Sequence, residues 1–140
     1  MKGSILQLFF DLLFPPACFG CAREGVWLCG ACARTLRRVA PRCFFCGAWT
    51  LSTQKRSAGH TCDSCRARTF VSCYGSPFSY RDPLIGKLIT RLKYHRMRPV
   101  AGLLGDFLAA YVREFNIIIP QDAVLTPIPL AQSRRRVRGF

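Results

Sequence analysis

The residues ACFGCAREGVWLCGAC (17–32) and CFFCGAWTLSTQKRSAGHTCDSC (43–65) decide how the first half of this chain folds. Together they hold four Cys-x-x-Cys pairs, made of Cys18, Cys21, Cys29, Cys32, Cys43, Cys46, Cys62 and Cys65. Two cysteines at this spacing can place both sulfur atoms on one tetrahedral zinc ion, and a closed structural site takes four such ligands. The four pairs therefore predict a module that binds two structural Zn²⁺ ions.

The simplest pairing of these ligands is sequential. The first site then takes the pairs at 18–21 and 29–32, which seven residues separate, and the second takes those at 43–46 and 62–65, which fifteen residues separate. An interleaved pairing, first with third and second with fourth, is also compatible with the spacing, because spacing alone does not fix the partners. His60, two residues before the last pair, is an alternative ligand.

The zinc sites are expected to be structural, because four thiolates leave no open coordination position for chemistry. A short segment with little apolar content also needs metal to fold. A redox role for one of the pairs is the competing interpretation. The ninth cysteine, Cys73, is interpreted as a small buried hydrophobic residue.

Nine cysteines in 140 residues indicate either the disulfides of a secreted protein or the metal sites of a cytosolic one. The first residues, MKGSILQLFFDLLFPPAC, combine Lys2 with an apolar run, as a signal peptide does. However, Asp11 interrupts the run and no clear small-x-small cleavage site follows it. We therefore expect a helix from Ile5 to Phe14, ended by Pro15, and a cytoplasmic protein. No apolar run reaches the roughly 18 residues that a membrane span needs.

Three segments follow from the composition. Residues 1–16 form the expected N-terminal helix, residues 17–73 carry every cysteine and form a double zinc-ribbon module, and residues 74–140 carry none. Within the cysteine-rich segment, the pattern predicts a short strand at 26–28 and a short helix at 31–39. Polar residues at 50–61 predict a loop.

In the last segment, Asp82 and Pro83 are a favourable N-cap and first residue for a helix. Apolar residues then recur at helical spacing as far as Pro99, and a second such helix extends to Phe115. Residues 123–130 predict a strand whose two prolines place its end at a sheet edge, and a basic loop is expected after it. One strand cannot make a sheet, so we expect an incomplete α/β domain, a fragment of a longer one.

The formal net charge of +14 favours polyanionic partners. Eight thiolates and two Zn²⁺ ions together lower it only to +10. Basic residues among the cysteines alternate with aromatic residues such as Phe44, Phe45 and Trp49, as in proteins that bind single strands. The same rings are equally interpreted as the core of a small module, and the charge as a solvated surface. Candidate nucleic-acid contacts are Arg34, Arg37, Arg38, Lys87 and Arg91.

Two further motifs, SYRDPLIGKLITRLKYHR (79–96) and LTPIPLAQSRRRVRGF (125–140), combine with the cysteine pairs into a recognisable order. This order resembles the ComF family of competence-associated, phosphoribosyltransferase-like proteins and its GntX-type relatives. The resemblance implies a zinc module followed by a type I phosphoribosyltransferase-like fold, a mostly parallel sheet with helices on both faces. It also implies a link to DNA uptake, with single-stranded DNA or a DNA-uptake helicase as partners, and phosphoribosyl pyrophosphate as a ligand of the full-length protein.

The resemblance further implies that Arg134, Arg138 and Gly139 lie near the pyrophosphate end of such a site. Guanidinium groups suit that position because they bind phosphates in a bidentate manner. However, the adjacent acidic pair that binds ribose in these enzymes is missing, because no two of the seven acidic residues are neighbours. Ala131 also stands where the family often has His. We therefore assign no catalytic residue and expect this chain alone to be inactive, whatever the activity of a longer protein. The alternative is a non-enzymatic, zinc-dependent module that binds single-stranded DNA or a protein.

Overall fold

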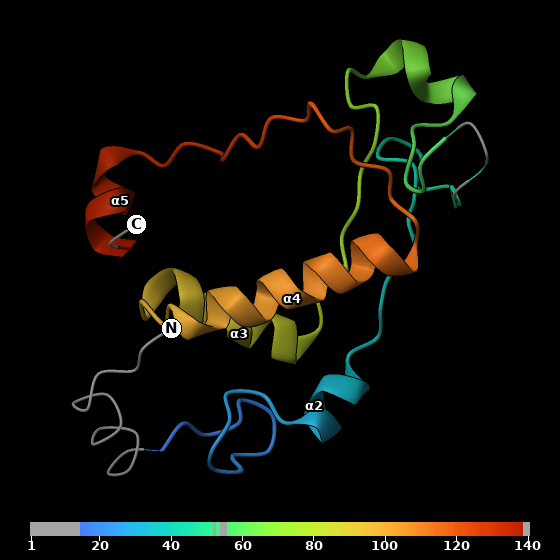
Figure 1. Cartoon of the computed structure of the whole chain (residues 1–140). Helices are drawn as coiled ribbons and strands as arrows, with labels where there is room; N and C mark the ends of the chain where they lie inside the picture. The colour runs from blue at the N-terminus through green and yellow to red at the C-terminus, as the bar shows by residue number, and fades with distance from the viewer. Residues whose placement is uncertain (1–14, 52, 54–55, 139–140) are drawn as a thin grey trace.

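The structure is a computed structural model of the chain, and it describes residues 15–51, 53 and 56–138. The predicted N-terminal helix and Gly139 lie outside these residues. In chain order, the helices are α2 (Gly30–Thr35), the 3₁₀ helix η1 (Asp63–Arg68), α3 (Pro83–Tyr94), α4 (Pro99–Glu114) and α5 (Gln132–Arg138). The pairing of extended chain that the structure describes consists of isolated antiparallel bridges. The helices α3 and α4 lie side by side at the centre of the molecule, with the two cysteine-rich lobes on different sides of them (Figure 1).

The two central helices begin where the sequence predicts. The Asp82 carboxylate accepts hydrogen bonds from the backbone N–H groups of Leu84 and Ile85 at 2.9 and 3.2 Å, so it caps α3. Pro83 occupies the first turn, where the missing N–H costs nothing. Pro99 opens α4 in the same way.

The main hydrophobic core lies between these helices and the first cysteine-rich lobe. Its buried members are Leu36, Ile85, Leu88 and Val100. Phe19 and Leu28 pack against them from the first lobe, and Phe78 meets Phe107 edge-on with ring centroids 5.1 Å apart. The first lobe and the helices therefore share one core.

Two neighbouring segments of the chain connect the second cysteine-rich lobe to the rest of the molecule. The chain enters it near Arg38 and leaves it near Phe78, and these residues pair as an antiparallel bridge. Next to them, the Val39 N–H donates to the Pro77 carbonyl at 3.0 Å. The buried side chains of this lobe are small ones or zinc ligands: Pro41, Cys43, Thr50, Ala58, Thr61 and Cys65. In the part of this lobe that the structure describes, the interior thus lacks large apolar side chains such as those that the first lobe shares with the helices.

Several predicted elements differ from the structure. Residues 26–28 and 123–130 form no strand, and Leu125 and Ile128 are 95 and 90 % exposed. Their sequences favour extended backbone, but a strand forms only when a second extended segment pairs with it. The described residues include no segment that pairs with either of them. The predicted α/β sheet is accordingly not seen in the described part of the chain.

The remaining differences are local. The expected helix at 31–39 is the shorter α2, because the chain becomes extended at Leu36, which enters the core. The predicted basic loop is instead α5, since arginine is a good helix former. The Cys73 side chain is exposed rather than buried, and its thiol donates to the Ala58 carbonyl at 3.2 Å. No helix that the structure describes is long and apolar enough to span a bilayer.

Candidate metal centres

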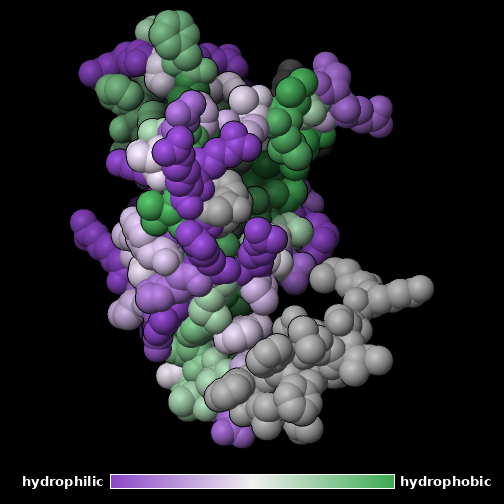
Figure 2. Space-filling model, turned by 90° about the vertical axis from the view of Figure 1, so that its left-hand side faces the viewer, coloured by the Kyte–Doolittle hydropathy of each residue, from purple (hydrophilic) through white to green (hydrophobic). Residues whose placement is uncertain are grey.

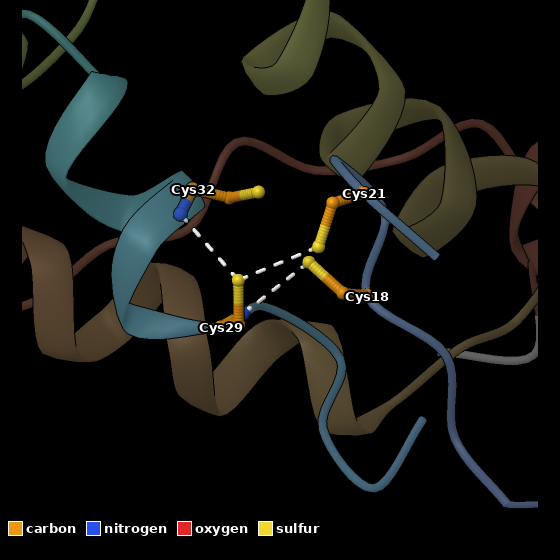
Figure 3. A group of neighbouring side chains, drawn as sticks. All are labelled: Cys18, Cys21, Cys29 and Cys32. Carbon is orange, nitrogen blue, oxygen red and sulfur yellow. Dashed lines mark hydrogen bonds between the residues drawn. The ribbon is translucent and has the colours of Figure 1, made fainter. Parts of the chain in front are cut away.

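The first metal centre brings together the sulfur atoms of Cys18, Cys21, Cys29 and Cys32, all within 4.8 Å of one another. The four sulfurs converge on a common point, two from the loop at 18–21 and two from the start of α2 (Figure 3). The sulfurs of Cys21 and Cys29 are 3.6 Å apart. A zinc tetrahedron with Zn–S bonds of about 2.3 Å has edges of about 3.8 Å, so the spacing suits this ion.

Backbone N–H groups prepare this centre for anionic sulfur. The Cys29 N–H donates to the Cys18 sulfur at 3.3 Å, and the Cys32 N–H points at the Cys29 sulfur at 3.5 Å. Backbone hydrogen bonds, first from Cys21 and then from Cys29, lower the pKa of Cys18 to about 6. The pKa of Cys32 rises to about 12, because its thiol is hydrogen-bonded to Cys29 and because burial disfavours its charged form. Four sulfurs this close all ionise only when a cation balances their charge.

The second centre repeats this chemistry with Cys43, Cys46, Cys62 and Cys65. The sulfurs of Cys46 and Cys62 are 3.6 Å apart. Backbone hydrogen bonds, first from Cys46 and then from Cys62, lower the pKa of Cys43 to about 6. The hydrogen bond with Cys62 and burial raise the pKa of Cys65 to about 12. The two clusters fit two structural zinc ions, one in each lobe.

The structure also decides between the pairings that the sequence left open. The sequential pairing is the one observed, and the interleaved one is not. His60 is not a member of either cluster. Its Nδ1 instead lies 3.0 Å from the Ser57 carbonyl oxygen. Each of the four Cys-x-x-Cys pairs belongs to a four-sulfur cluster.

Two of the five predicted nucleic-acid contacts have partners within the fold. Arg38 forms an ion pair with Glu114 at the end of α4. The Lys87 ammonium donates to the Phe19 carbonyl at 2.8 Å, which ties α3 to the first zinc lobe. The other three predicted residues are the exposed Arg34 in the last turn of α2, the exposed Arg37 just after it and the half-buried Arg91 on α3.

The second lobe places guanidinium groups on aromatic rings. The Arg42 guanidinium lies 4.2 Å from the ring centre of Trp49, and that of Arg68 lies 4.3 Å from the ring centre of Phe45. Trp49 is 62 % exposed and Phe45 is 44 % exposed. We call these two arginine–ring pairs the stacked pairs. Sequence reasoning missed Arg68, because it meets Phe45 only after η1 and the second zinc site have folded.

A separate hollow brings together two of the residues predicted to bind phosphate. Arg134 and Arg138 of α5 line a cavity of about 320 Å³ with Tyr94, Ser133 and Val137. The Arg138 guanidinium lies 5.8 Å from the ring centre of Tyr94. The Arg96 guanidinium donates to the Val137 carbonyl at 2.9 Å and so holds the last turn of α5 near α3. On the side of the molecule that α5 faces, hydrophilic side chains surround smaller apolar patches (Figure 2).

Comparison with known families supports the zinc module. Residues 9–66 match the model of a double zinc ribbon domain. This segment contains both four-cysteine clusters. No curated protein and no solved structure matches the chain. The N-terminal part of the chain is therefore a zinc-binding double zinc ribbon.

Proposed function

We propose that this chain is a zinc-stabilised module that binds single-stranded nucleic acid through its second lobe. The observation that carries the proposal is the pair of exposed stacks, Arg42 on Trp49 and Arg68 on Phe45. Rings of this kind stack on bases of any sequence, and the adjacent guanidinium groups attract phosphates. The net charge of +14 without zinc supports a polyanionic partner.

The rings of the second lobe are better explained as a surface than as a core. Phe44 is 52 % exposed and Trp49 is 62 % exposed, and the described residues of this lobe include no buried large apolar side chain that these rings could cover. One zinc ion stabilises this lobe in place of an apolar core, so the aromatic residues are left at the surface. Large exposed rings beside cations are typical of single-strand binding sites.

The wider biological assignment rests on the resemblance to the ComF family. On this basis we propose that the chain is the N-terminal part of a phosphoribosyltransferase-like protein in the cytoplasm. Its partner would be single-stranded DNA during uptake, or the helicase that delivers that DNA. Cysteines that form zinc sites fit a reducing compartment, where thiols persist.

The test is the binding of a fluorescent single-stranded oligonucleotide, measured by anisotropy at several salt concentrations. Wild-type protein should bind at low salt and release the strand steeply as salt rises, because phosphate contacts displace counterions. Trp49→Ala and Phe45→Ala should each weaken binding about tenfold, within the range known for single stacked bases. Trp49→Phe is the matched control and should recover most of the loss, because it restores a ring. Absence of binding at low salt, or unchanged affinity in both alanine variants, would contradict the proposal.

A second candidate function is binding of phosphate groups at the hollow of Arg134 and Arg138. The proximity of the two guanidinium groups in one cavity with Ser133 favours it. Calorimetry with inorganic pyrophosphate should show weak binding that Arg134→Gln and Arg138→Gln each reduce. Phosphoribosyl pyrophosphate should bind no more tightly, because no adjacent acidic pair is present to hold its ribose. Tight, stoichiometric binding of phosphoribosyl pyrophosphate would contradict this.

A further inference from the structure

A larger cavity lies between the second zinc lobe and the central helices. Its volume is about 520 Å³. Its wall includes Arg42 from the lobe, Ile89 from α3 and Tyr111 from α4, with Tyr74, Phe78 and Tyr80 from the connecting chain. Four of the twelve residues that line the cavity are aromatic, and their ring faces suit a flat, aromatic occupant.

One polar group in the wall of this cavity lacks a partner. Tyr111 is only 1 % exposed, and its hydroxyl makes no hydrogen bond of normal geometry with the described residues, although the backbone of Ser76 lies near enough to lower its pKa. Buried hydroxyl groups are nearly always hydrogen-bonded, and an exception calls for an explanation such as a missing ligand. Like an ordinary tyrosine, Tyr111 is uncharged at neutral pH, and burial raises its pKa further, so its hydroxyl can donate or accept a hydrogen bond.

The cavity is continuous with the surface proposed to bind a single strand. Arg42 stacks on Trp49 and also lines the cavity. Tyr74 lines the cavity too, and its ring centre lies 5.6 Å from that of Phe44 on the same lobe. A strand stacked on the lobe would therefore pass the opening of the cavity.

We propose that this cavity binds one nucleobase, with its faces against the aromatic wall and a polar edge on the Tyr111 hydroxyl. The inference builds on the proposed single-strand function and adds a base-recognition subsite to it. Arg42 stands where it can meet the phosphate of the same nucleotide. A nucleobase suits this wall because it is flat and carries hydrogen-bonding atoms on its edge, as the single buried hydroxyl requires.

The experiment uses the full chain with 3-fluorotyrosine in place of its four tyrosines. Tyr74, Tyr80 and Tyr111 line the cavity, whereas Tyr94 lines the separate hollow beside α5, so Tyr94 is an internal control. Single Tyr→Phe variants assign the four fluorine signals. The probes are adenosine, guanosine, cytidine and uridine, which carry no phosphate. At least one should shift the three cavity signals in a saturable manner and leave the Tyr94 signal in place.

Tyr111→Phe tests the hydroxyl itself. This variant removes one unpartnered oxygen and keeps the ring, so it should fold as the wild type does. Its affinity for the preferred nucleoside should fall about tenfold, as expected for one lost hydrogen bond. Tyr94→Phe is the matched control and should bind as the wild type does. Unchanged affinity in Tyr111→Phe, or no saturable shift of the cavity signals with any nucleoside, would overturn the inference.

The outcome is separable from that of the proposed function. If the oligonucleotide binds through Trp49 and Phe45 but no nucleoside shifts the cavity signals, the subsite is wrong and the single-strand surface stands. If a nucleoside binds with the predicted dependence on Tyr111 but the oligonucleotide does not bind, the cavity serves a free nucleoside and the single-strand function fails.

Discussion

The two zinc lobes use the same four-cysteine chemistry but stand in opposite relations to the rest of the molecule. The first contributes Phe19 and Leu28 to the main core and is tied to α3 by Lys87. The second buries no large apolar side chain among its described residues, and it exposes Phe44, Phe45 and Trp49. The comparison indicates a supporting role for the first lobe, and it agrees with the binding role that we propose for the second.

The largest expected effect follows from breaking one zinc site at a time. Cys18→Ser should reduce bound zinc from two equivalents to one and loosen α3 and α4 as well, because the first lobe shares their core. Cys43→Ser should lose the same amount of zinc but leave these helices intact. Zinc content and hydrogen exchange of the helix amides measure the two effects.

Binding of the single strand should also distinguish these two variants, and here Cys43→Ser should have the larger effect. Cys43→Ser removes the fold that holds the stacked pairs, so it should abolish binding to the single strand. Equal loss of helix protection in Cys18→Ser and Cys43→Ser would show that the two lobes do not differ in their support of the core.

A smaller effect is expected at a glycine in each lobe. A Cβ at Gly20 would lie 2.6 Å from the Cys32 sulfur, and one at Gly59 would lie 2.1 Å from the Tyr74 carbonyl oxygen. Gly59 also has a φ of +79°, which costs an L-residue about 1–2 kcal/mol. We expect Gly20→Ala to weaken zinc binding at the first site only, and Gly59→Ala to destabilise the second lobe by about 2 kcal/mol or more.

Competition with a chromogenic chelator distinguishes a weakly bound zinc ion from a tightly bound one. It therefore measures the loss of zinc affinity in Gly20→Ala and in Gly59→Ala. Gly102→Ala is the matched control, because nothing lies within 4 Å of its added Cβ in the first turns of α4. It should stabilise the helix by about 0.5–1 kcal/mol and leave both zinc ions tightly bound. If Gly59→Ala behaves like this control, the turn at Gly59 does not limit the second lobe.

The parts of the structure that the sequence predicts are those decided by local chemistry. Ligand spacing identifies the eight zinc ligands but not their pairing, and the Asp82–Pro83 cap fixes the start of α3. Both signals lie within a few residues of the element that they determine. The prediction therefore needs no knowledge of the tertiary fold.

The parts that the sequence does not predict depend on partners far along the chain. The apolar residues of 123–130 favour a strand, but no neighbouring strand is described that could pair with them. The stack of Arg68 on Phe45 joins residues on either side of the second zinc site. The first lobe's support of α3 likewise depends on Lys87 reaching Phe19, a contact across 68 residues of sequence. Long-range contacts of this kind leave no periodic signal.

The smallest expected effect concerns the polar links that attach each lobe to the helices. Lys87→Met keeps the side-chain stem but removes the hydrogen bond to the Phe19 carbonyl, which should cost about 1 kcal/mol. Arg38→Met removes the ion pair with Glu114, which is partly exposed and should cost only about 0.2–1 kcal/mol. Thermal unfolding at low and high salt distinguishes them, because screening weakens the ion pair more than the hydrogen bond to a neutral carbonyl. If the first lobe supports the helices, Lys87→Met lowers their melting temperature more than Arg38→Met does. If Arg38→Met instead lowers the melting temperature more, the second lobe also stabilises α4 through Arg38.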